Sequence, residues 1–336
     1  QEHQYTPNIV RNGKEPIDYA SVPLTMYAHY ESTTFETISE VLESYYAERN
    51  SYSRIRQKSV DLRKIVSTAL ERNVKKYDLQ IKQQRDADKK EKYKLYGELL
   101  QAYGYGIEAG AKFAEVENYY NNNNLIKIPL DPDLSALDNS KKFFEKYGKL
   151  KRTSEALEGL IEETHTQILH LESIQNALDI ATSADDLIQI KDELMEYGFI
   201  KKNRSAKKEK SKSKPFHYRS SDGYDIFVGK NNYQNDELSF KVATGNDWWF
   251  HAKGMPGSHV IVKANNEELP DRVFEEAGRL AGYYSKGRDN EKIEIDYLQK
   301  KNLKKPSGAA PGFVVYYTNY SLVIEPDISG IELISD

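Results

Sequence analysis

The sequence predicts an α+β protein: a long antiparallel coiled coil with a β-hairpin tip, followed by a compact α+β domain with a mostly antiparallel sheet. Two long stretches, near residues 34–103 and 134–197, carry apolar residues three or four positions apart, which is the spacing of one buried helix face. Residues 114–130 between them have the pattern of a hairpin. From residue 216 onward, short apolar runs separated by turn residues predict strands packed around a helix.

These patterns divide the 336-residue chain into four segments. Residues 1–33 are interpreted as the tail of an upstream N-terminal domain, residues 34–200 as the coiled-coil arm, residues 201–215 as a basic linker, and residues 216–336 as the C-terminal domain. Charged residues make up 30% of the chain and hydrophobic residues 38%, which favours long solvated helices over one large globule. Because the sequence begins at Gln1 rather than at a methionine, we expect it to be a fragment.

Cysteine chemistry and membrane insertion are not expected from the composition. The chain has no cysteine, so disulfide bonds and thiolate catalysis are absent. No run approaches the roughly 18 apolar residues needed to cross a bilayer, so we expect no membrane insertion. A secretion signal is not visible either.

Charge is distributed unevenly along the chain. The net charge is −4, but residues 201–214 hold eight Lys or Arg and one Glu, whereas the segments on either side are acidic. A basic segment of this kind is typical of a solvated linker or of an electrostatic tether to phosphate. We therefore treat its lysines as candidates for RNA binding.

The N-terminal residues contain three prolines and are predicted to be irregular, with one short strand around Val22 to Met26. Thr33 stands three residues before Glu36, the spacing of a capping box, and predicts the start of the first helix. Its apolar stripe thins over residues 82–92 and then resumes. The helix is predicted to end after about Tyr103, where three closely spaced glycines follow: Gly104, Gly106 and Gly110.

The second helix is predicted as one element from about Leu134 to Tyr197. Its apolar residues follow heptad-like spacing, interrupted by polar Ser154, Thr164 and Gln175. Two amphipathic helices in sequence most simply pair with each other in an antiparallel coiled coil. Self-dimerisation through the same stripe is the alternative.

The hairpin between the helices contains four consecutive asparagines. Asparagine tolerates positive φ, so this run predicts the turn. A tip far from the main body is suited to contacting a partner, although it can also serve only to close the pair of helices. The candidate partner-binding residues are Tyr119, Asn121, Asn122, Asn123 and Asn124.

The C-terminal domain is predicted from its alternation of strand and helix patterns. A hairpin, a helix entered through an asparagine, two strands, an amphipathic helix and three further strands follow one another, the last two strands joined by a Thr318-Asn319 turn. The corresponding ranges are 216–219 with 224–229, 231–242, 248–252, 258–262, 270–284, 293–299, 313–317 and 320–325.

Residues 247–261 concentrate aromatic and cationic side chains. Trp248 and Trp249 are the only tryptophans of the chain, and His251, Lys253 and His259 follow them around a Pro-Gly turn. Aromatic faces beside a cation suit contact with a nucleobase or a phosphate. The alternative is a buried strand pair in which the aromatic rings belong to the core.

Asparagine and lysine side chains supply further candidates on either side of that segment. Asn231, Asn232 and Asn235 can cap a helix, or can point toward an anion at the helix N-terminus. Lys304 and Lys305 precede a loop of small residues that would let a nucleic-acid backbone approach closely. The alternative is that they are ordinary surface lysines.

Catalysis is not indicated by any motif. His251, His259, Asp236 and Asp247 could be imagined as a metal site, but their spacing matches no common ligand pattern. Neither a phosphate-binding glycine loop nor a nucleophile motif is present. We therefore expect no enzymatic activity, no metal and no cofactor.

Three blocks carry a family resemblance. Asn231 to Asp236, Asp247 to Ile261 and Lys304 to Gly312 resemble the NFACT-R domain of the RqcH/FbpA family, which includes streptococcal fibronectin/fibrinogen-binding proteins. The preceding helices are similar to the coiled-coil middle segment of the same family. The family's NFACT-N domain would be represented here only by its last residues.

The resemblance implies a function in ribosome-associated quality control. Family members bind the large ribosomal subunit, carrying an obstructed nascent chain on tRNA, and help to recruit alanyl-tRNA for alanine tailing. The coiled-coil tip is implied to touch the stalk base, and the NFACT-R domain to bind RNA. The family's tRNA-selecting motif belongs to the N-terminal domain, so this fragment is expected to bind ribosomal RNA or protein without sustaining tailing; tRNA would be bound through the full-length protein.

The family name also implies an alternative, an adhesin that binds host fibronectin or fibrinogen at the cell surface. The basic linker and the NFACT-R blocks favour RNA and a cytoplasmic location, whereas the acidic arm permits protein adhesion. The candidate RNA-binding residues are Lys207, Lys208, Lys210, Lys212, Lys214, Arg219, Asn231, Asn232, Asn235, Trp249, His251, Lys253, His259, Lys304 and Lys305.

Overall fold

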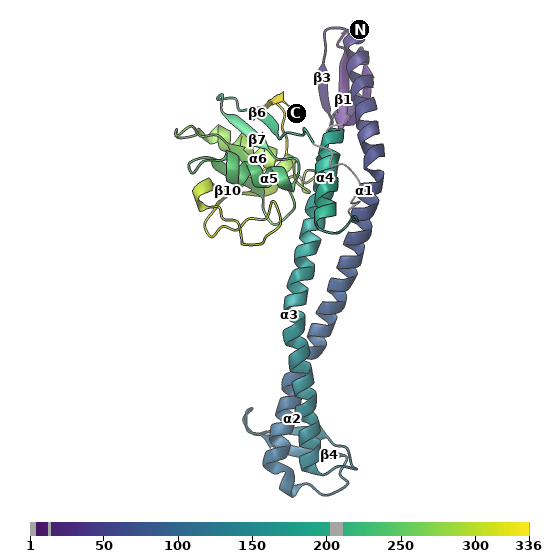
Figure 1. Ribbon diagram of the computed structural model, residues 1–336, viewed down its shortest axis with the longest axis vertical. Helices are drawn as coiled ribbons and strands as arrows, with labels where there is room; N and C mark the ends of the chain where they lie inside the picture. Colours follow the sequence, from purple (N-terminus) through teal and green to yellow (C-terminus); the bar gives the residue numbers. More distant parts are fainter. Residues whose placement is uncertain (1–4, 13–14, 202–210, 336) are drawn as a thin grey trace. The chain divides into compact units, whose positions relative to one another are not determined.

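The computed structural model describes residues 5–12, 15–201 and 211–335 (Figure 1). It separates into two compact units, one formed by Gln1–Ala69 together with Leu169–Asp336 and the other by Leu70–Ile168. Each unit is taken by itself below. No helix within the described ranges has the length and apolar character that a membrane span requires.

The described N-terminal residues form a small antiparallel sheet with strand order β2-β1-β3. The strands are β1 (Asn8–Asn12), β2 (Glu15–Ala20) and β3 (Glu31–Thr34). The prediction of an irregular segment was therefore wrong, as was the strand around Val22 to Met26, where a 3-10 turn, η1 (Thr25–Tyr27), occurs instead. Pro16 misled the prediction because it lies in β2, an edge strand, where a missing N–H is tolerated.

The first helix, α1 (Ile38–Ala87), begins four residues later than predicted. The amide of Glu40 donates to Thr37 Oγ1 at 3.2 Å, and the amide of Thr37 donates to Glu40 Oε2 at 3.2 Å, which forms the capping box. Thr33 has the same spacing to an acidic residue, but it is paired with Ile9 in the sheet. Ile9 packs against Val41 and Tyr45, which joins the sheet to α1.

In the unit of residues 70–168, α2 (Lys90–Tyr103) follows α1 and passes through a short 3-10 turn, η2 (Gly104–Gly106), into the hairpin. The hairpin pairs β4 (Phe113–Asn118) with β5 (Asn124–Pro129), and the chain returns in α3 (Ala136–Ile180). Asn122 and Asn123 have φ of 48° and 54°, so the asparagine-rich turn is confirmed.

Contacts of the end of α1 and of α2 with α3 confirm the antiparallel coiled coil. Ser140 Oγ donates to the Gly97 carbonyl at 2.8 Å, and a Cβ at Gly97 would lie 2.7 Å from the ring of Phe144. Gln84, earlier in the chain, reaches Ser154, later in the chain, at 2.9 Å. Residue 84 thus lies beside residue 154 and residue 97 beside residue 140, so the helices run antiparallel. Gly97 has no side chain and lets the two backbones approach closely.

The second helix is broken where one continuous element was predicted. After α3 ends at Ile180, α4 (Ala184–Glu196) begins with its own capping box. The Asp186 amide donates to Ser183 Oγ at 3.2 Å, and the Ser183 amide donates to Asp186 Oδ2 at 2.8 Å. The Ser-x-x-Asp signal is visible in the sequence, but apolar residues three or four positions apart resume beyond it at Leu187, Ile190 and Leu194, so one continuous helix was predicted.

Among residues 211–335, seven strands form one antiparallel sheet in the order β11-β10-β8-β9-β7-β6-β12 (Figure 1). This confirms the predicted α+β class. The sheet strands are β6 (Phe216–Arg219), β7 (Asp225–Val228), β8 (Trp248–Ala252), β9 (Val260–Val262), β10 (Ile293–Gln299), β11 (Tyr320–Ile324) and β12 (Glu332–Ser335).

Helices cover the sheet. The amphipathic α6 (Asp271–Tyr283) buries Val273, Ala277 and Leu280 against it, as predicted. The other face is packed by α5 (Asn232–Glu237), the π-helical turn η3 (Leu238–Val242) and residues near η4 (Lys300–Asn302). The predicted strand at 313–317 is wrong, since it makes only an isolated bridge between Lys304 and Val315, and β12 was missed.

Candidate nucleic-acid interface

The predicted aromatic platform at Trp249 is buried. Trp249 is 1% exposed and packs with Leu238, Ile261 and Leu298 on the face of the sheet that α5 and η3 cover. Successive strand residues point to opposite faces, so Trp248 instead contacts Phe274 of α6 at 4.8 Å between ring centroids. The interpretation of Trp249 as an RNA-stacking residue is therefore corrected: its ring is part of the core.

His251 and His259, which were predicted to bind RNA, are uncharged near neutral pH and so do not attract a phosphate. Burial lowers the pKa of His251 to about 4, and burial followed by the neighbouring His251 holds the pKa of His259 well below its usual range. His259 Nδ1 lies 2.7 Å from Ser239 Oγ, and its ring centroid is 5.1 Å from that of Trp249. Neutral, packed imidazoles of this kind stabilise the domain and do not attract an anion.

The three candidate asparagines are also buried, and their amides are already hydrogen bonded. Asn231 is the N-cap of α5, as predicted: Asn231 Oδ1 accepts from the Gln234 amide at 3.1 Å. Asn232 Nδ2 donates to Glu193 Oε1 at 2.8 Å, and Asn235 Oδ1 accepts from the His259 amide at 3.0 Å. The expectation that Asn231 and Asn232 face an anion is overturned, because they face α3 and α4 of the same unit.

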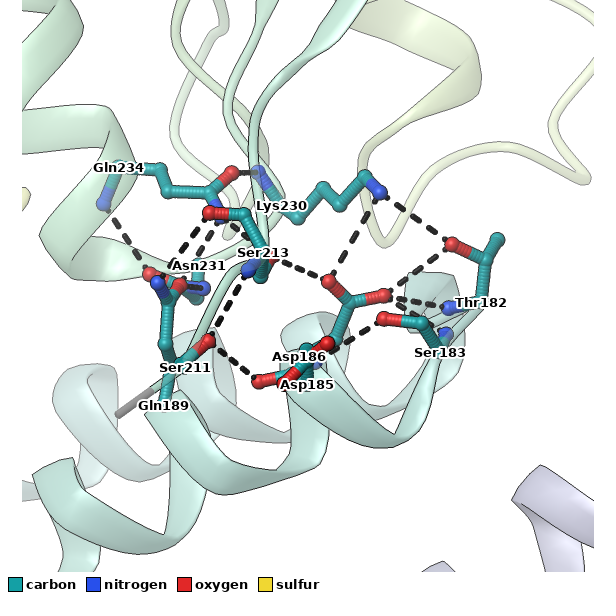
Figure 2. Close-up of polar contacts among 10 residues, drawn as sticks. All are labelled: Thr182, Ser183, Asp185, Asp186, Gln189, Ser211, Ser213, Lys230, Asn231 and Gln234. Atoms are coloured by element: carbon teal, nitrogen blue, oxygen red, sulfur yellow. Dashed lines mark hydrogen bonds and ion pairs between the residues drawn. The ribbon is translucent and has the colours of Figure 1, made fainter. Parts of the chain in front are cut away.

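A polar network joins these residues to α4, and Figure 2 shows its members. Asn231 Nδ2 and Gln234 Nε2 both donate to Gln189 Oε1, at 2.6 and 2.9 Å. Ser211 Oγ donates to the Asp185 carbonyl at 2.9 Å, which fixes the last residues of the linker. We call the following ten residues the docking network: Thr182, Ser183, Asp185, Asp186, Gln189, Ser211, Ser213, Lys230, Asn231 and Gln234.

An ion pair lies at the centre of the docking network (Figure 2). Lys230 is 3% exposed and Asp186 is 1% exposed, with Lys230 Nζ 3.7 Å from Asp186 Oδ1 and 3.3 Å from Thr182 Oγ1. Burial acts to raise the pKa of Asp186, but the Ser213 hydroxyl, Lys230 and two backbone amides outweigh it and lower that pKa. The Lys230 ammonium also lies 4.3 Å from the ring centroid of Phe216.

Several predicted cations are neutralised by neighbouring acids. Arg219 lies 3.4 Å from Asp225, Lys253 pairs with Glu294, and Lys305 Nζ lies 2.6 Å from Asp236 Oδ1. In the linker, Lys212 and Lys214 are exposed. Three further candidates lie outside the described residues: Lys207, Lys208 and Lys210.

A second group of lysines has no acidic partner within the described residues, and we call Lys241, Lys300, Lys301 and Lys304 the lysine strip. The Lys301 amide donates to the Gly245 carbonyl at 3.1 Å, and Lys304 exchanges two backbone hydrogen bonds of 2.9 Å with Val315. Lys300 Nζ lies 5.9 Å from the Phe240 ring centroid. The strip therefore comprises one lysine in η3 and three on the chain that leaves β10.

The sequence prediction included only Lys304 of the lysine strip. A sequence signal was present: Lys300-Lys301 and Lys304-Lys305 are two lysine pairs four residues apart, a spacing that can place cations on the same side of a short turn. Lys241 is distant in sequence, and it is included because Lys300 contacts Phe240, the residue before Lys241 in η3.

The predicted tip residues lie where they were expected. Tyr119 and Tyr120 are exposed beside the hairpin turn, with ring centroids 4.4 Å apart, and the Asn124 amide donates to the Asn121 carbonyl at 3.0 Å. Asn122 and Asn123 occupy the left-handed positions of the turn. Their contact with a partner stays a prediction.

The comparisons with known proteins divide the chain at the linker. Residues 1–213 match the family model for the NFACT N-terminal and middle domains, and residues 214–317 match that for the NFACT protein RNA binding domain. A protein of Streptococcus suis named Rqc2 homolog RqcH is 38% identical over 293 residues, 87% of this chain and 52% of the relative. The Bacillus subtilis protein of the same name is 33% identical over 332 residues, 97% of this chain and 57% of the relative.

The chain thus spans about half the length of the curated relatives it matches. It is also similar to the solved structure of the C-terminal of the fibronectin/fibrinogen-binding protein from Streptococcus suis, with a TM-score of 0.65 and 34% identity, over 83% of this chain and 99% of that one. Two family models and two kinds of relative agree with the resemblance carried by the three sequence blocks. The chain therefore belongs to the NFACT family of RqcH and FbpA proteins.

Proposed function

We propose that this chain is the non-catalytic, RNA-binding part of a ribosome quality-control factor. In this proposal it binds the large ribosomal subunit that carries peptidyl-tRNA and supports alanine tailing of stalled nascent chains in the cytoplasm, with tRNA bound through the full-length protein. The carrying observation is the lysine strip, four cations without acidic partners among the described residues, on the domain that matches the NFACT RNA-binding model. Cations of this kind bind phosphates by releasing counterions.

The state of the other polar groups supports binding rather than catalysis. His259 is buried and His251 stacks on the core residue Trp249, while Asp186 and Lys230 neutralise each other in the docking network. These four side chains thus have structural partners, whereas the lysine strip has no acidic partner among the described residues. This arrangement is suited to recognising a polyanion.

Co-sedimentation with purified large ribosomal subunits, across a salt series, tests the proposal. We expect the chain to pellet with the subunit at low salt and to be released as salt rises, because phosphate contacts are weakened by competing counterions. Fibronectin binding, measured in parallel, tests the second candidate function, which the similarity to a fibronectin/fibrinogen-binding protein favours. Saturable fibronectin binding without pelleting would replace the ribosome proposal by an adhesin.

Removal of the strip charges is expected to flatten the salt dependence. In a variant with glutamine at Lys241, Lys300, Lys301 and Lys304, the slope of log affinity for RNA against log salt should fall by about 3, since each lost phosphate contact contributes about 0.7 to 0.9. A control variant with glutamine at Arg219, Lys253 and Lys305, whose charges are already paired, should change the slope much less. Equal slopes for the strip variant and the parent would contradict the assignment.

Loss of the tip aromatics is expected to weaken ribosome association selectively. Tyr119→Ser with Tyr120→Ser removes exposed rings while leaving the hairpin ladder, so pelleting with the large subunit should fall several-fold and binding to free RNA should not change. Leu79→Ser, at an exposed apolar site on α1, serves as the matched control. Unchanged pelleting of the double variant would remove the tip from the interface.

A further inference from the structure

Tyr317 is an exposed aromatic ring in a well-anchored segment. It is 84% exposed, the highest value for a large apolar side chain in the described part of the C-terminal domain. The residue before it points inward: Tyr316 packs on Trp249 with ring centroids 5.5 Å apart. Tyr316 is thus half-buried against the core, whereas the chain bends at Tyr317 and leaves that ring exposed.

A buried carboxylate anchors this segment. Asp296, which is 4% exposed, accepts hydrogen bonds from Tyr316 Oη at 2.8 Å, Asn319 Nδ2 at 2.8 Å and Ser321 Oγ at 2.7 Å. Burial and the contact with Asp296 raise the pKa of Tyr316, so its hydroxyl remains a donor. The chain on both sides of Tyr317 is therefore anchored before any ligand arrives, which lowers the entropy cost of ordering this segment on binding.

The lysine strip supplies charge beside this ring. Lys304 Nζ lies 5.7 Å from the Tyr317 ring centroid, and the backbone bonds between Lys304 and Val315 hold the two segments together. Tyr320 differs, because its ring already stacks on Tyr297 with centroids 5.4 Å apart. Among the described residues, Lys304 is the one cation that lies beside the Tyr317 ring, and the ring surface that it leaves exposed is open to a ligand.

We propose that Tyr317 stacks on an unpaired base of an RNA strand whose phosphates lie along the lysine strip. The surface then selects single-stranded or looped RNA over duplex RNA, because the base faces of a duplex are covered by their neighbours. This inference rests on the proposed RNA-binding function and adds the class of RNA that the site takes.

Binding of the 336-residue chain to two labelled RNAs tests the inference: an oligouridine of about 12 nucleotides, a length within the range of known single-strand sites, and a duplex of equal length. Tyr317→Ser should weaken binding of the oligouridine by about tenfold, within the range reported for loss of one stacked base, and leave duplex binding within about twofold. Tyr317→Phe keeps the ring and should bind like the parent. Tyr317→Leu keeps apolar bulk without a ring and should bind like the serine variant.

The outcomes separate this inference from the function on which it rests. If Tyr317→Ser loses no affinity, loses it equally for both RNAs, or is matched by a fully active Tyr317→Leu, stacking is refuted while RNA binding stands. If the four-lysine variant binds both RNAs as tightly as the parent, the proposed RNA-binding face itself fails. Thermal unfolding of the serine variant should match that of the parent, because the ring is exposed.

Discussion

Asp186→Ala is expected to release the C-terminal domain from α4. The substitution removes the carboxylate that faces the buried Lys230 ammonium, and breaking one side of a buried ion pair costs about 3–5 kcal/mol. It also removes half of the capping box at the start of α4. Hydrogen exchange should show faster exchange at the Gln234 amide and in α4, and limited proteolysis should cleave residues 211–215 more readily.

The neighbouring acid provides the control for this prediction. Asp185 contributes its backbone carbonyl to the docking network, so Asp185→Ala should leave exchange and proteolysis close to those of the parent (Figure 2). Asp186→Asn combined with Lys230→Met should recover part of the loss, since no uncompensated charge then remains buried. An Asp186→Ala variant with parental exchange rates would show that the ion pair contributes nothing to docking.

The same pair gives the docking network a defined dependence on pH. The pKa of Asp186 is lower in the folded protein than its ordinary value, so the stabilisation is complete above about pH 4. It is lost as pH falls through the lowered folded-state pKa, where the carboxylate takes up a proton. Docking followed by hydrogen exchange should therefore weaken on acidification and should not respond to changes between pH 6 and 8.

Trp249→Ala is expected to lower the free energy of unfolding by about 3–5 kcal/mol, the usual cost of removing a large buried aromatic side chain. The ring contacts Leu238, Ile261 and Leu298 and leaves a cavity that these neighbours fill only in part. Denaturant unfolding followed by circular dichroism measures this loss. At a temperature where the variant is folded, its affinity for RNA should equal that of the parent.

Tyr317→Ser is the complementary control, since it should keep parental stability and lose affinity for unpaired RNA. The two variants thus separate a core aromatic residue from a surface one. A folded Trp249→Ala variant with weakened RNA binding would return Trp249 to the interface and contradict its assignment to the core.

The periodic elements could be predicted from the sequence because local rules govern them. The asparagine turn, the N-cap at Asn231 and the face of α6 depend on nearby residues alone. Which of two adjacent tryptophans is accessible depends on which elements cover each side of the sheet, and the strand pattern does not contain that information. The start of α1 was predicted wrongly for a related reason. Thr33 and Thr37 each stand three residues before a glutamate, and only the pairing of Thr33 in β3 decides which of them caps the helix.

The sequence predicted that lysines and aromatic rings form the candidate site, but it pointed mostly to other residues than those of the lysine strip and Tyr317. Conspicuous residues of the sequence belong to the docking network, as Asn231 does, or to the core, as Trp249 does, whereas the strip lysines and Tyr317 are ordinary surface residues. A side chain that is distinctive in sequence is often one that must fit a crowded environment, as Asn235 does: a Cβ at Gly229 would lie 2.2 Å from Asn235 Oδ1. Surface recognition by lysine and tyrosine imposes no such constraint and leaves a weaker sequence signal.

The order of the large sheet has a consequence for how the protein behaves at high concentration. In the described residues, β11 pairs with β10 on one side only, and Val323, the fourth of its five residues, is 65% exposed. An open edge with an apolar side chain can accept a strand from a second molecule, which leads to self-association or fibril growth. Val323→Lys would place a charge at that edge and is the substitution that should keep concentrated samples monodisperse without affecting the core.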